Sequence, residues 1–473
     1  MEQENKHEVL KLYPYQEEGV GYIHQMKRLI DSDEMGLGKS ATSIVAIERA
    51  KATPCLVICP SALKINWQRE CQRFTNLKPL ILTDSVKSTF PYFLTGSMGL
   101  YDVIITNYES LKKFFVVDAP KPYKLSTMVF QNVVKQLKSV IIDESARVKE
   151  PSALSTKICA GICHGKEYVV GLTGTPIVNC PPNLATQLAV IGRINDFEGG
   201  YGGFLDRYGG TSKTDPPRNL DELRRKITGT MFFRRSKTLV LKDLPDLTRT
   251  TVETELDPVT QEEYDTCQQD LIKYLTEYKN LTDKEAKRKM RMAALIRFMN
   301  LRSISAKGKV SSAIDFLNDC QEPCIVFCEH HDVVDELHNA FPNTSVCVTG
   351  RQNAQQKQYA IDSFQAGRKD IIICSIKAAG VGLTLTRATH ELFVELPWTM
   401  ADLSQCEARA WRNGQKNAVN SWCLIGKDTI DNYLFKLIMD KGKMANRITG
   451  ASDDVIKDEV FFDELAEMFL GSK

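Results

Sequence analysis

Short apolar runs alternate with segments of helical periodicity along both halves of the chain. In the first half these runs are Pro54–Cys59, Val103–Thr106, Val140–Asp143 and Val169–Thr173. In the second half they are Cys324–Cys328, Ser345–Thr349, Ile371–Ser375 and Glu391–Leu396. Apolar runs of this length, joined by helical segments, are typical of parallel sheets that are covered by helices on both faces. The pattern therefore predicts an α/β fold with two parallel sheets.

The strand pattern largely disappears between Phe197 and Lys309, where charged residues become more frequent. This stretch predicts helical insertions and the connection between two α/β domains. We expect a first domain over residues 1–245 with a helical insertion near 197–240, a helical basic connector over 246–309, and a second domain over 310–473 that ends in an acidic tail over 451–473.

The composition is that of an ordinary globular protein. The 473 residues include 61 Lys plus Arg against 59 Asp plus Glu, with 43% apolar and 25% charged residues. This balance excludes a disordered, collagen-like or coiled-coil chain. No run approaches the roughly 18 apolar residues that a membrane span needs, and the N-terminus predicts neither a signal peptide nor a transit peptide. We expect a cytoplasmic protein of bacterial or phage origin, or a nuclear one if the host is eukaryotic.

The charge is unevenly distributed. Between Leu281 and Lys309 nine Lys or Arg residues stand against two acidic ones, which predicts a phosphate-binding surface. A solvated helix face, or a nuclear-import-like string at residues 287–289, is the alternative interpretation of the same run.

A zinc site can be drawn from Cys320, Cys324, Cys328, His330 and His331. Their spacing lacks the tight Cys-x2-Cys knuckle of structural zinc sites, and residues 323–328 have the pattern of a buried strand. We therefore expect buried, reduced thiols here and no structural zinc.

The sharpest local signal is Asp33–Ser40, which leads into the helix-compatible run Ala41–Ala50. Its glycines let backbone N–H groups turn inward around phosphates, Lys39 would reach the β- and γ-phosphates, and Ser40 would offer a hydroxyl to Mg²⁺. Asp33 stands where such loops usually have their first glycine. The segment predicts a nucleotide-binding loop.

A second signal supports the first. The apolar run Ser139–Ile142 ends in two carboxylates, which places Asp143 to hold Mg²⁺ and Glu144 to orient and deprotonate an attacking water. Further along, Arg409 and Arg412 are three residues apart and hence expected on one helix face. They would stabilise the charge that develops on the γ-phosphate, as arginine fingers reaching across an inter-domain cleft. An ordinary exposed Arg pair that closes a helix at Gly414 is the alternative.

In this order the motifs resemble those of the superfamily-two helicase fold, and within it the Swi/Snf family of DNA-stimulated ATPases. Tyr13–Gln16 resembles the adenine-reading Gln motif, and motifs I, Ia and II match Asp33–Ser40, Cys59–Trp67 and Asp143–Ala146. The remaining motifs are matched by Ile105–Glu109, Leu172–Pro176, Ile325–Phe327, Ser375–Leu385 and Gln405–Gln415. The resemblance implies two RecA-like lobes with helical insertions between them.

Features beyond these motifs refine the resemblance. Phe204–Tyr208 and the Asp-Glu-Ser start of motif II are most similar to the annealing-helicase and fork-remodelling group. The family usually has His where this chain has Ala146, so the coupling of hydrolysis to movement is expected to be looser. Thr399 and Met400 also depart from the Asn-Pro that usually follows Trp398.

What the resemblance implies is an ATP hydrolase that uses ATP and Mg²⁺ to translocate on double-stranded or forked DNA. The alternative is a strand-separating or annealing helicase that acts on forks, single strands or RNA. Targeting would come from a protein partner. By the same resemblance, the nucleotide contacts are Gln16, Gly36, Leu37, Gly38, Lys39, Ser40, Gly174, Gly380 and Gly382. The nucleic-acid contacts are Lys64, Trp67, Asn107, Gly350, Ser375 and Lys377.

Overall fold

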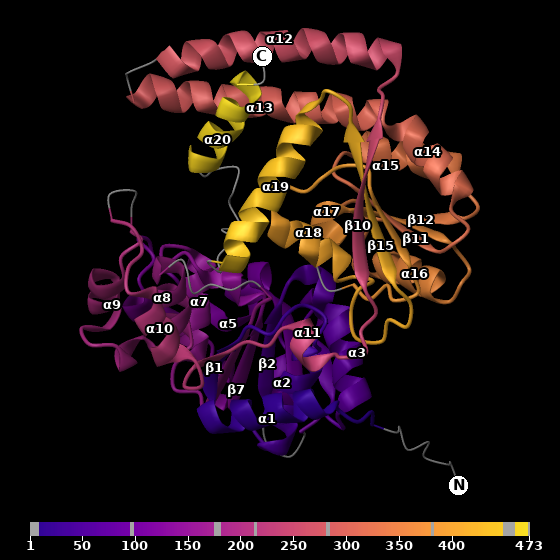
Figure 1. Ribbon diagram of the computed structural model, residues 1–473. Helices are drawn as coiled ribbons and strands as arrows, with labels where there is room; N and C mark the ends of the chain where they lie inside the picture. The colour runs from indigo at the N-terminus through magenta and orange to yellow at the C-terminus, as the bar shows by residue number, and fades with distance from the viewer. Residues whose placement is uncertain are drawn as a thin grey trace. The chain divides into compact units, whose positions relative to one another are not determined.

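The computed structural model describes residues 9–94, 99–174, 181–211, 215–280, 284–379, 383–447 and 459–471. The chain divides into two compact units, Met1–Lys242 and Asp243–Lys473 (Figure 1). Each unit contains one large parallel sheet with helices packed on it, so the predicted α/β class with two parallel sheets is confirmed.

The first unit is built on a seven-stranded sheet with the order β3-β4-β2-β7-β8-β1-β9. Its strands are β1 Arg28–Asp31, β2 Cys55–Cys59, β3 Pro79–Ile81, β4 Val103–Asn107, β7 Ser139–Asp143, β8 Tyr168–Leu172 and β9 Phe232–Phe233; β5 Val116–Asp118 and β6 Val129–Phe130 form a separate antiparallel pair. The helices are α1 Pro14–Met26, α2 Lys39–Arg49, α3 Lys64–Phe74, α4 Phe90–Leu94, α5 Leu111–Phe115, α6 Val133–Gln136, α7 Leu154–Cys163, α8 Pro181–Val190, α9 Gly200–Tyr208, α10 Leu220–Ile227 and α11 Lys237–Val240.

The burial of the central strands explains why they appear as apolar runs in the sequence. Every residue of β2, β4, β7 and β8 is buried, because helices cover both faces of the sheet. Since the strands are parallel, their carboxyl ends meet at one edge. That edge carries the segments that follow β1, β2, β4, β7 and β8, and these segments hold the motif residues of this unit other than Tyr13–Gln16, which lie at the start of α1.

The second unit has a six-stranded parallel sheet with the order β10-β15-β14-β11-β13-β12. Its strands are β10 Leu247–Thr254, β11 Cys324–Cys328, β12 Ser345–Val348, β13 Ile371–Ser375, β14 His390–Phe393 and β15 Val419–Gly426. The helices are α12 Pro258–Asn280, α13 Lys284–Gly308, α14 Val310–Asp319, α15 His331–Ala340, α16 Ala354–Gln365, α17 Ile376–Ala379, α18 Met400–Glu407, α19 Ile430–Arg447 and α20 Glu459–Leu470.

The segment expected as a helical connector over 246–309 belongs to the second unit. It begins with β10, which pairs along its whole length with β15, and continues into α12 and α13, which run side by side (Figure 1). The connector is therefore part of the second sheet and its helical cover. Within the described residues, the tail of the chain forms α20, which packs its Phe462 ring against Tyr278 of α12 and Phe298 of α13.

No helix in the described part of the chain has both the length and the apolar character that crossing a bilayer requires. The same residues contain no cluster of three or more His, Cys, Asp and Glu side chains with the arrangement of a metal site. Cys324 and Cys328 lie buried in β11, and His330 pairs with Glu395.

Candidate nucleotide site and nucleic-acid-facing loops

The loop between β1 and α2 has the backbone of an anion-binding site. Gly36 and Gly38 have φ angles of +87° and +79°, which only glycine adopts readily. A Cβ at Gly38 would lie 2.2 Å from Nε2 of Gln16, so the close approach of α1 also requires glycine. The loop leads into the N-terminus of α2, where Ser40 lies in the first turn and backbone N–H groups point outward.

The ammonium of Lys39 lies over this loop. Its Nζ donates to the backbone oxygens of Asp33, at 2.6 Å, and Glu34, at 3.3 Å. Both acceptors are uncharged, so the positive charge of Lys39 is not neutralised by these bonds. A cation, two glycines in the left-handed region and a helix N-terminus together fit the phosphates of a nucleotide.

Gln16 is tied to the loop from α1. Its Nε2 donates to the Leu37 oxygen at 3.1 Å, and its Oε1 accepts the backbone N–H of Tyr13 at 2.9 Å. The side chain of Gln16 is 3% exposed and Leu37 is buried. The amide that is predicted to read adenine therefore lies directly against the predicted phosphate loop.

Asp33, the departure from the usual first glycine, is explained by Arg235. The Arg235 guanidinium donates from Nε to both carboxylate oxygens of Asp33, at 3.2 and 3.1 Å. The backbone N–H of Arg235 donates to Oδ1 of Asp33 at 2.8 Å. Arg235 also donates to the Tyr15 oxygen of α1. This buried pair anchors the start of the loop to residues that follow β9, 202 positions away in sequence.

Asp143 lies at the carboxyl end of β7, on the same sheet edge. It is 9% exposed; its Oδ2 accepts the indole N–H of Trp67 at 2.7 Å, and its Oδ1 accepts the Glu144 N–H at 3.0 Å. Burial raises the pKa of Asp143, while the bond from Trp67 and the charge of Lys39 act in the opposite direction. A buried carboxylate near Lys39 fits the predicted magnesium ligand.

The position of Trp67 corrects one prediction. Trp67 was expected to contact nucleic acid, but its side chain is 1% exposed and its N–H is bound to Asp143. The aromatic residue of this motif thus lies inside the protein because its ring packs in the core and its polar atom finds a buried carboxylate.

Glu144 is held in an uncommon backbone conformation. Its φ and ψ are +52° and +53°, in the left-handed region that non-glycine residues seldom adopt. The phenol of Tyr108, which follows β4, donates to the Asp143 oxygen at 2.5 Å and lies 3.3 Å from the Glu144 oxygen. The Arg147 N–H also donates to the Glu144 oxygen, at 2.9 Å. These bonds fix the turn on which the predicted general base lies.

Asp31 adds a carboxylate that the motifs did not reveal. It ends β1 and is fully buried; its Oδ1 accepts the Asp33 N–H at 3.0 Å, and its Oδ2 has no hydrogen-bond partner among the described residues. Burial, followed by the charge of Asp33, raises the pKa of Asp31 to about 8. Asp31 is therefore mostly protonated at neutral pH.

Gly174, which follows β8, lies close to the loop between β1 and α2. A Cβ at this position would lie 2.5 Å from Cγ of Met35, so glycine allows the two segments to meet. Gly380 and Gly382, which were also predicted to contact nucleotide, lie outside the described residues.

In the second unit, Arg409 and Arg412 are brought together in an unexpected way. Helix α18 ends at Glu407, so the expectation that both arginines lie on one helix face is wrong. They follow the helix, and each donates from Nη1 to the Leu383 oxygen, at 3.4 Å for Arg409 and 3.1 Å for Arg412. Arg409 is 5% exposed, which makes Arg412 the more accessible of the two.

The other predicted nucleic-acid contacts lie at the carboxyl ends of strands. In the first unit, Lys64 begins α3 after β2, and Asn107 ends β4 with its amide donating to Glu109 at 2.7 Å. In the second unit, Ser375 ends β13, Lys377 lies in α17 and Gly350 follows β12. Lys377 is 84% exposed in its side chain and pairs with Glu329 at 2.6 Å.

The basic run over 281–309 is less continuous than its sequence suggests. Arg302 is buried against Trp398, with its guanidinium 4.1 Å from the ring centroid, and Lys309 is buried beside Asp431. Arg297 pairs with Asp270 and Lys307 with Asp332. Two of the nine cations are therefore core residues and two more are paired with carboxylates; residues 281–283 and the side chains of residues 284–288 lie outside the described part of the chain.

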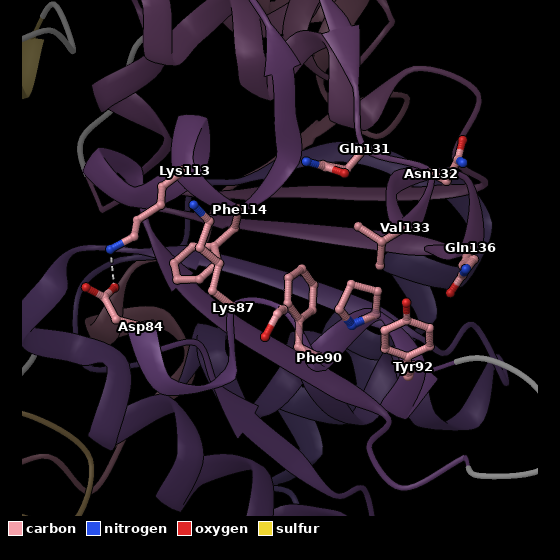
Figure 2. A pocket seen from close by; sticks show the side chains of 12 residues that line it. Asp84, Lys87, Phe90, Tyr92, Lys113, Phe114, Gln131, Asn132, Val133 and Gln136 are labelled. Carbon is pink, nitrogen blue, oxygen red and sulfur yellow. Dashed lines mark hydrogen bonds and ion pairs between the residues drawn. The ribbon is translucent and has the colours of Figure 1, made fainter.

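A separate cavity of about 890 Å³ lies in the first unit between α4, α5 and residues 131–136 (Figure 2). Phe90 and Tyr92 face Val133 and Gln136 across it, and the Lys113–Asp84 pair lies at one end. None of the predicted site residues lines this cavity.

Two family models match the chain, and they meet inside the second unit, at the end of α13. The SNF2-related domain matches residues 15–309, and the helicase conserved C-terminal domain matches residues 308–414. The chain is 27% identical over 467 residues to the SWI/SNF-related matrix-associated actin-dependent regulator of chromatin subfamily A-like protein 1 homolog of Caenorhabditis elegans, covering 94% of this chain and 62% of that protein.

Two further relatives and one solved structure are similar to this chain. The chain is 26% identical to the human DNA annealing helicase and endonuclease ZRANB3 (96% of this chain, 41% of that protein) and 26% identical to an uncharacterized ATP-dependent helicase of Mycoplasma pneumoniae (97% and 43%). The Sulfolobus solfataricus SWI2/SNF2 ATPase core in complex with dsDNA matches with a TM-score of 0.44 and 22% identity, covering 97% of both chains.

The chain spans between 40% and 62% of the length of these and the other curated relatives that were compared. The SNF2-related match alone covers more than half of the chain and contains the loop, Asp143 and Glu144. The protein is therefore a member of the SNF2-related family.

Proposed function

We propose that this protein is an ATP-driven motor that translocates on double-stranded DNA. The observation that carries the proposal is the shared carboxyl edge of the first sheet, where the Lys39 loop follows β1 and Asp143 and Glu144 lie at the end of β7, the two strands that pair in parallel with β8 on either side. Hydrolysis of a phosphoanhydride needs alignment of water and neutralisation of charge, and these side chains supply both.

Each residue has a distinct role in this proposal. The loop N–H groups and Lys39 bind the β- and γ-phosphates, while Ser40 and Asp143 hold Mg²⁺, which supplies charge neutralisation on the phosphate oxygens when bound. Glu144 orients the attacking water and accepts its proton. Arg409 and Arg412 remain the predicted source of positive charge for the transition state.

The nucleic-acid contacts proposed here are phosphate contacts. Lys64 at the N-terminus of α3, the backbone beyond β4 and the exposed Lys377 present cations, amides and N–H groups, which bind the backbone of DNA without reading its sequence. Binding should therefore weaken steeply with salt.

The test is steady-state ATP hydrolysis without nucleic acid and with single-stranded DNA, duplex DNA, forked DNA or RNA, each at low and moderate salt. The proposal expects strong stimulation by duplex or fork that fades as salt rises, and a Lys39→Ala variant should show no stimulated hydrolysis. Hydrolysis that ignores duplex and forked DNA would contradict it.

A second candidate, annealing or separation of strands at forks, is favoured by the similarity to proteins that are named DNA annealing helicases. Release or annealing of a labelled strand, measured beside hydrolysis, distinguishes this activity from translocation on intact duplex.

A further inference from the structure

We infer that Trp67 and Tyr108 couple the nucleic-acid-facing loops of the first unit to the ATP site, by hydrogen bonds to Asp143 and Glu144. The inference rests on the proposed function, because it explains how DNA on these loops would accelerate hydrolysis. It assigns a positioning role to two residues that would touch neither ATP nor DNA.

The first link starts at Lys64. Lys64 and Trp67 lie three residues apart in the first turn of α3, so a shift of this turn moves both. The Trp67 N–H donates to Oδ2 of Asp143 at 2.7 Å across 76 positions of sequence. Both side chains are buried, so the bond has no competition from bulk water. A phosphate that draws in the N-terminus of α3 thereby acts on the orientation of the Asp143 carboxylate.

The second link starts at Asn107. The next residue, Tyr108, is buried and donates to the Asp143 oxygen at 2.5 Å, with the Glu144 oxygen 3.3 Å away. These are the two backbone oxygens that flank the left-handed turn at Glu144. Because such a conformation costs energy for a non-glycine residue, a bond that holds it controls where the Glu144 carboxylate points.

A third contact lies beside the second. The Asn107 amide donates to Glu109, and Glu109 pairs with Arg147 at 3.5 Å, while the Arg147 guanidinium lies over the Tyr108 ring with 5.7 Å to its centroid. This pair is exposed and contributes little energy by itself. It shows that the segment after β4 and the segment after β7 touch at several points.

This arrangement addresses the missing His at Ala146. Coupling through that position is not available to an alanine, which has no polar side chain. Trp67 and Tyr108 reach the same Asp143–Glu144 pair from two DNA-facing segments, so coupling does not depend on residue 146.

The experiment compares Trp67→Phe and Tyr108→Phe, which remove one hydrogen-bond donor each and keep the ring. Two variants are matched controls. Trp422→Phe removes an indole N–H that has no hydrogen-bond partner among the described residues. Tyr208→Phe removes a hydroxyl that is bonded to Glu222, on the same unit as Tyr108. For each protein one measures hydrolysis without DNA, hydrolysis at saturating duplex, and the duplex Kd from fluorescence anisotropy.

We expect the ratio of stimulated to unstimulated hydrolysis to fall about fivefold in each Phe variant, the effect of about one hydrogen bond, with duplex Kd changed less than twofold. The two controls should keep the wild-type ratio. If both rates fell in proportion, so that the ratio stayed constant, the residues would merely shape the site and the inference would be overturned. A wild-type protein without stimulation would overturn both this inference and the proposed function.

Discussion

At the residue scale, the buried carboxyl group of Asp31 gives the free energy of unfolding a dependence on pH. Its pKa in the folded protein is about 8, raised first by burial and then by Asp33, while Lys39 and Arg235 oppose the shift. The unfolded chain has the ordinary value of about 3.9. Between these values the folded protein holds a proton that the unfolded chain has lost, so the Asp31 contribution to the free energy of unfolding falls as pH rises.

The variant Asp31→Asn tests whether the Asp31 contribution to the free energy of unfolding falls as pH rises. Relative to Asp31→Asn, the wild-type protein should lose up to about 1.4 kcal/mol of unfolding free energy per pH unit between roughly pH 5 and pH 7, and the loss should level off above pH 8. Urea titrations of both proteins at several pH values give the difference. A constant difference across this range would show that Asp31 is ionised in the folded protein.

Glu144 tests the chemistry of the same site. Replacement by Gln keeps the shape of the side chain and removes the base, so hydrolysis should fall at least about 100-fold while the Kd for MgATP stays within about threefold. Glu167→Gln, which changes an exposed carboxylate on the same unit, should keep the wild-type rate. Unchanged hydrolysis in Glu144→Gln would contradict the assignment of Glu144 as the base.

Local spacing predicted the phosphate loop and the Asp143–Glu144 pair because their residues are neighbours in sequence. It could not predict the Arg235–Asp33 pair or the Trp67–Asp143 bond, which join residues 202 and 76 positions apart. Trp67 was placed at the nucleic acid for the same reason, since its motif gives no information about which way the ring turns. Asp31 could not be predicted either, because one acidic residue at the end of a short strand forms no pattern.

At the element scale, α20 provides a test of packing. Phe462 is 1% exposed, and its ring lies 5.4 Å from Tyr278 and 6.0 Å from Phe298, centroid to centroid. Phe462→Ala should lower the free energy of unfolding by about 3 kcal/mol, whereas Met292→Ala, on the exposed face of α13, should change it by less than about 0.5 kcal/mol. Urea unfolding followed by circular dichroism measures both. Equal effects would mean that α20 is not docked in solution.

The elements whose ends the sequence predicted best are strands that are buried on both faces. β2, β4, β7, β8, β11 and β13 are continuous apolar runs, and each was placed within one residue of its observed ends. β10 lies in the stretch that the sequence predicts as a helical connector, because it is an edge strand whose Thr, Arg and Glu residues give no continuous apolar run. β9 has two residues, too few for any periodicity.

At the scale of the whole molecule, Arg412 tests whether the second unit takes part in hydrolysis. Arg412→Ala should lose most turnover, about 100-fold or more, with little change in duplex Kd, because an arginine that acts on the transition state contributes little to binding DNA. Arg351→Ala, which removes an exposed arginine paired with Asp335 on the same unit, is the matched control. Near-normal turnover in Arg412→Ala would remove it from the catalytic residues.

Movement along duplex DNA is measured most directly by displacement of a labelled third strand from a DNA triplex placed ahead of the motor. We predict ATP-dependent displacement by the wild-type protein that requires a duplex flank and disappears in Glu144→Gln. Stimulated hydrolysis without displacement of the third strand would contradict translocation on duplex DNA.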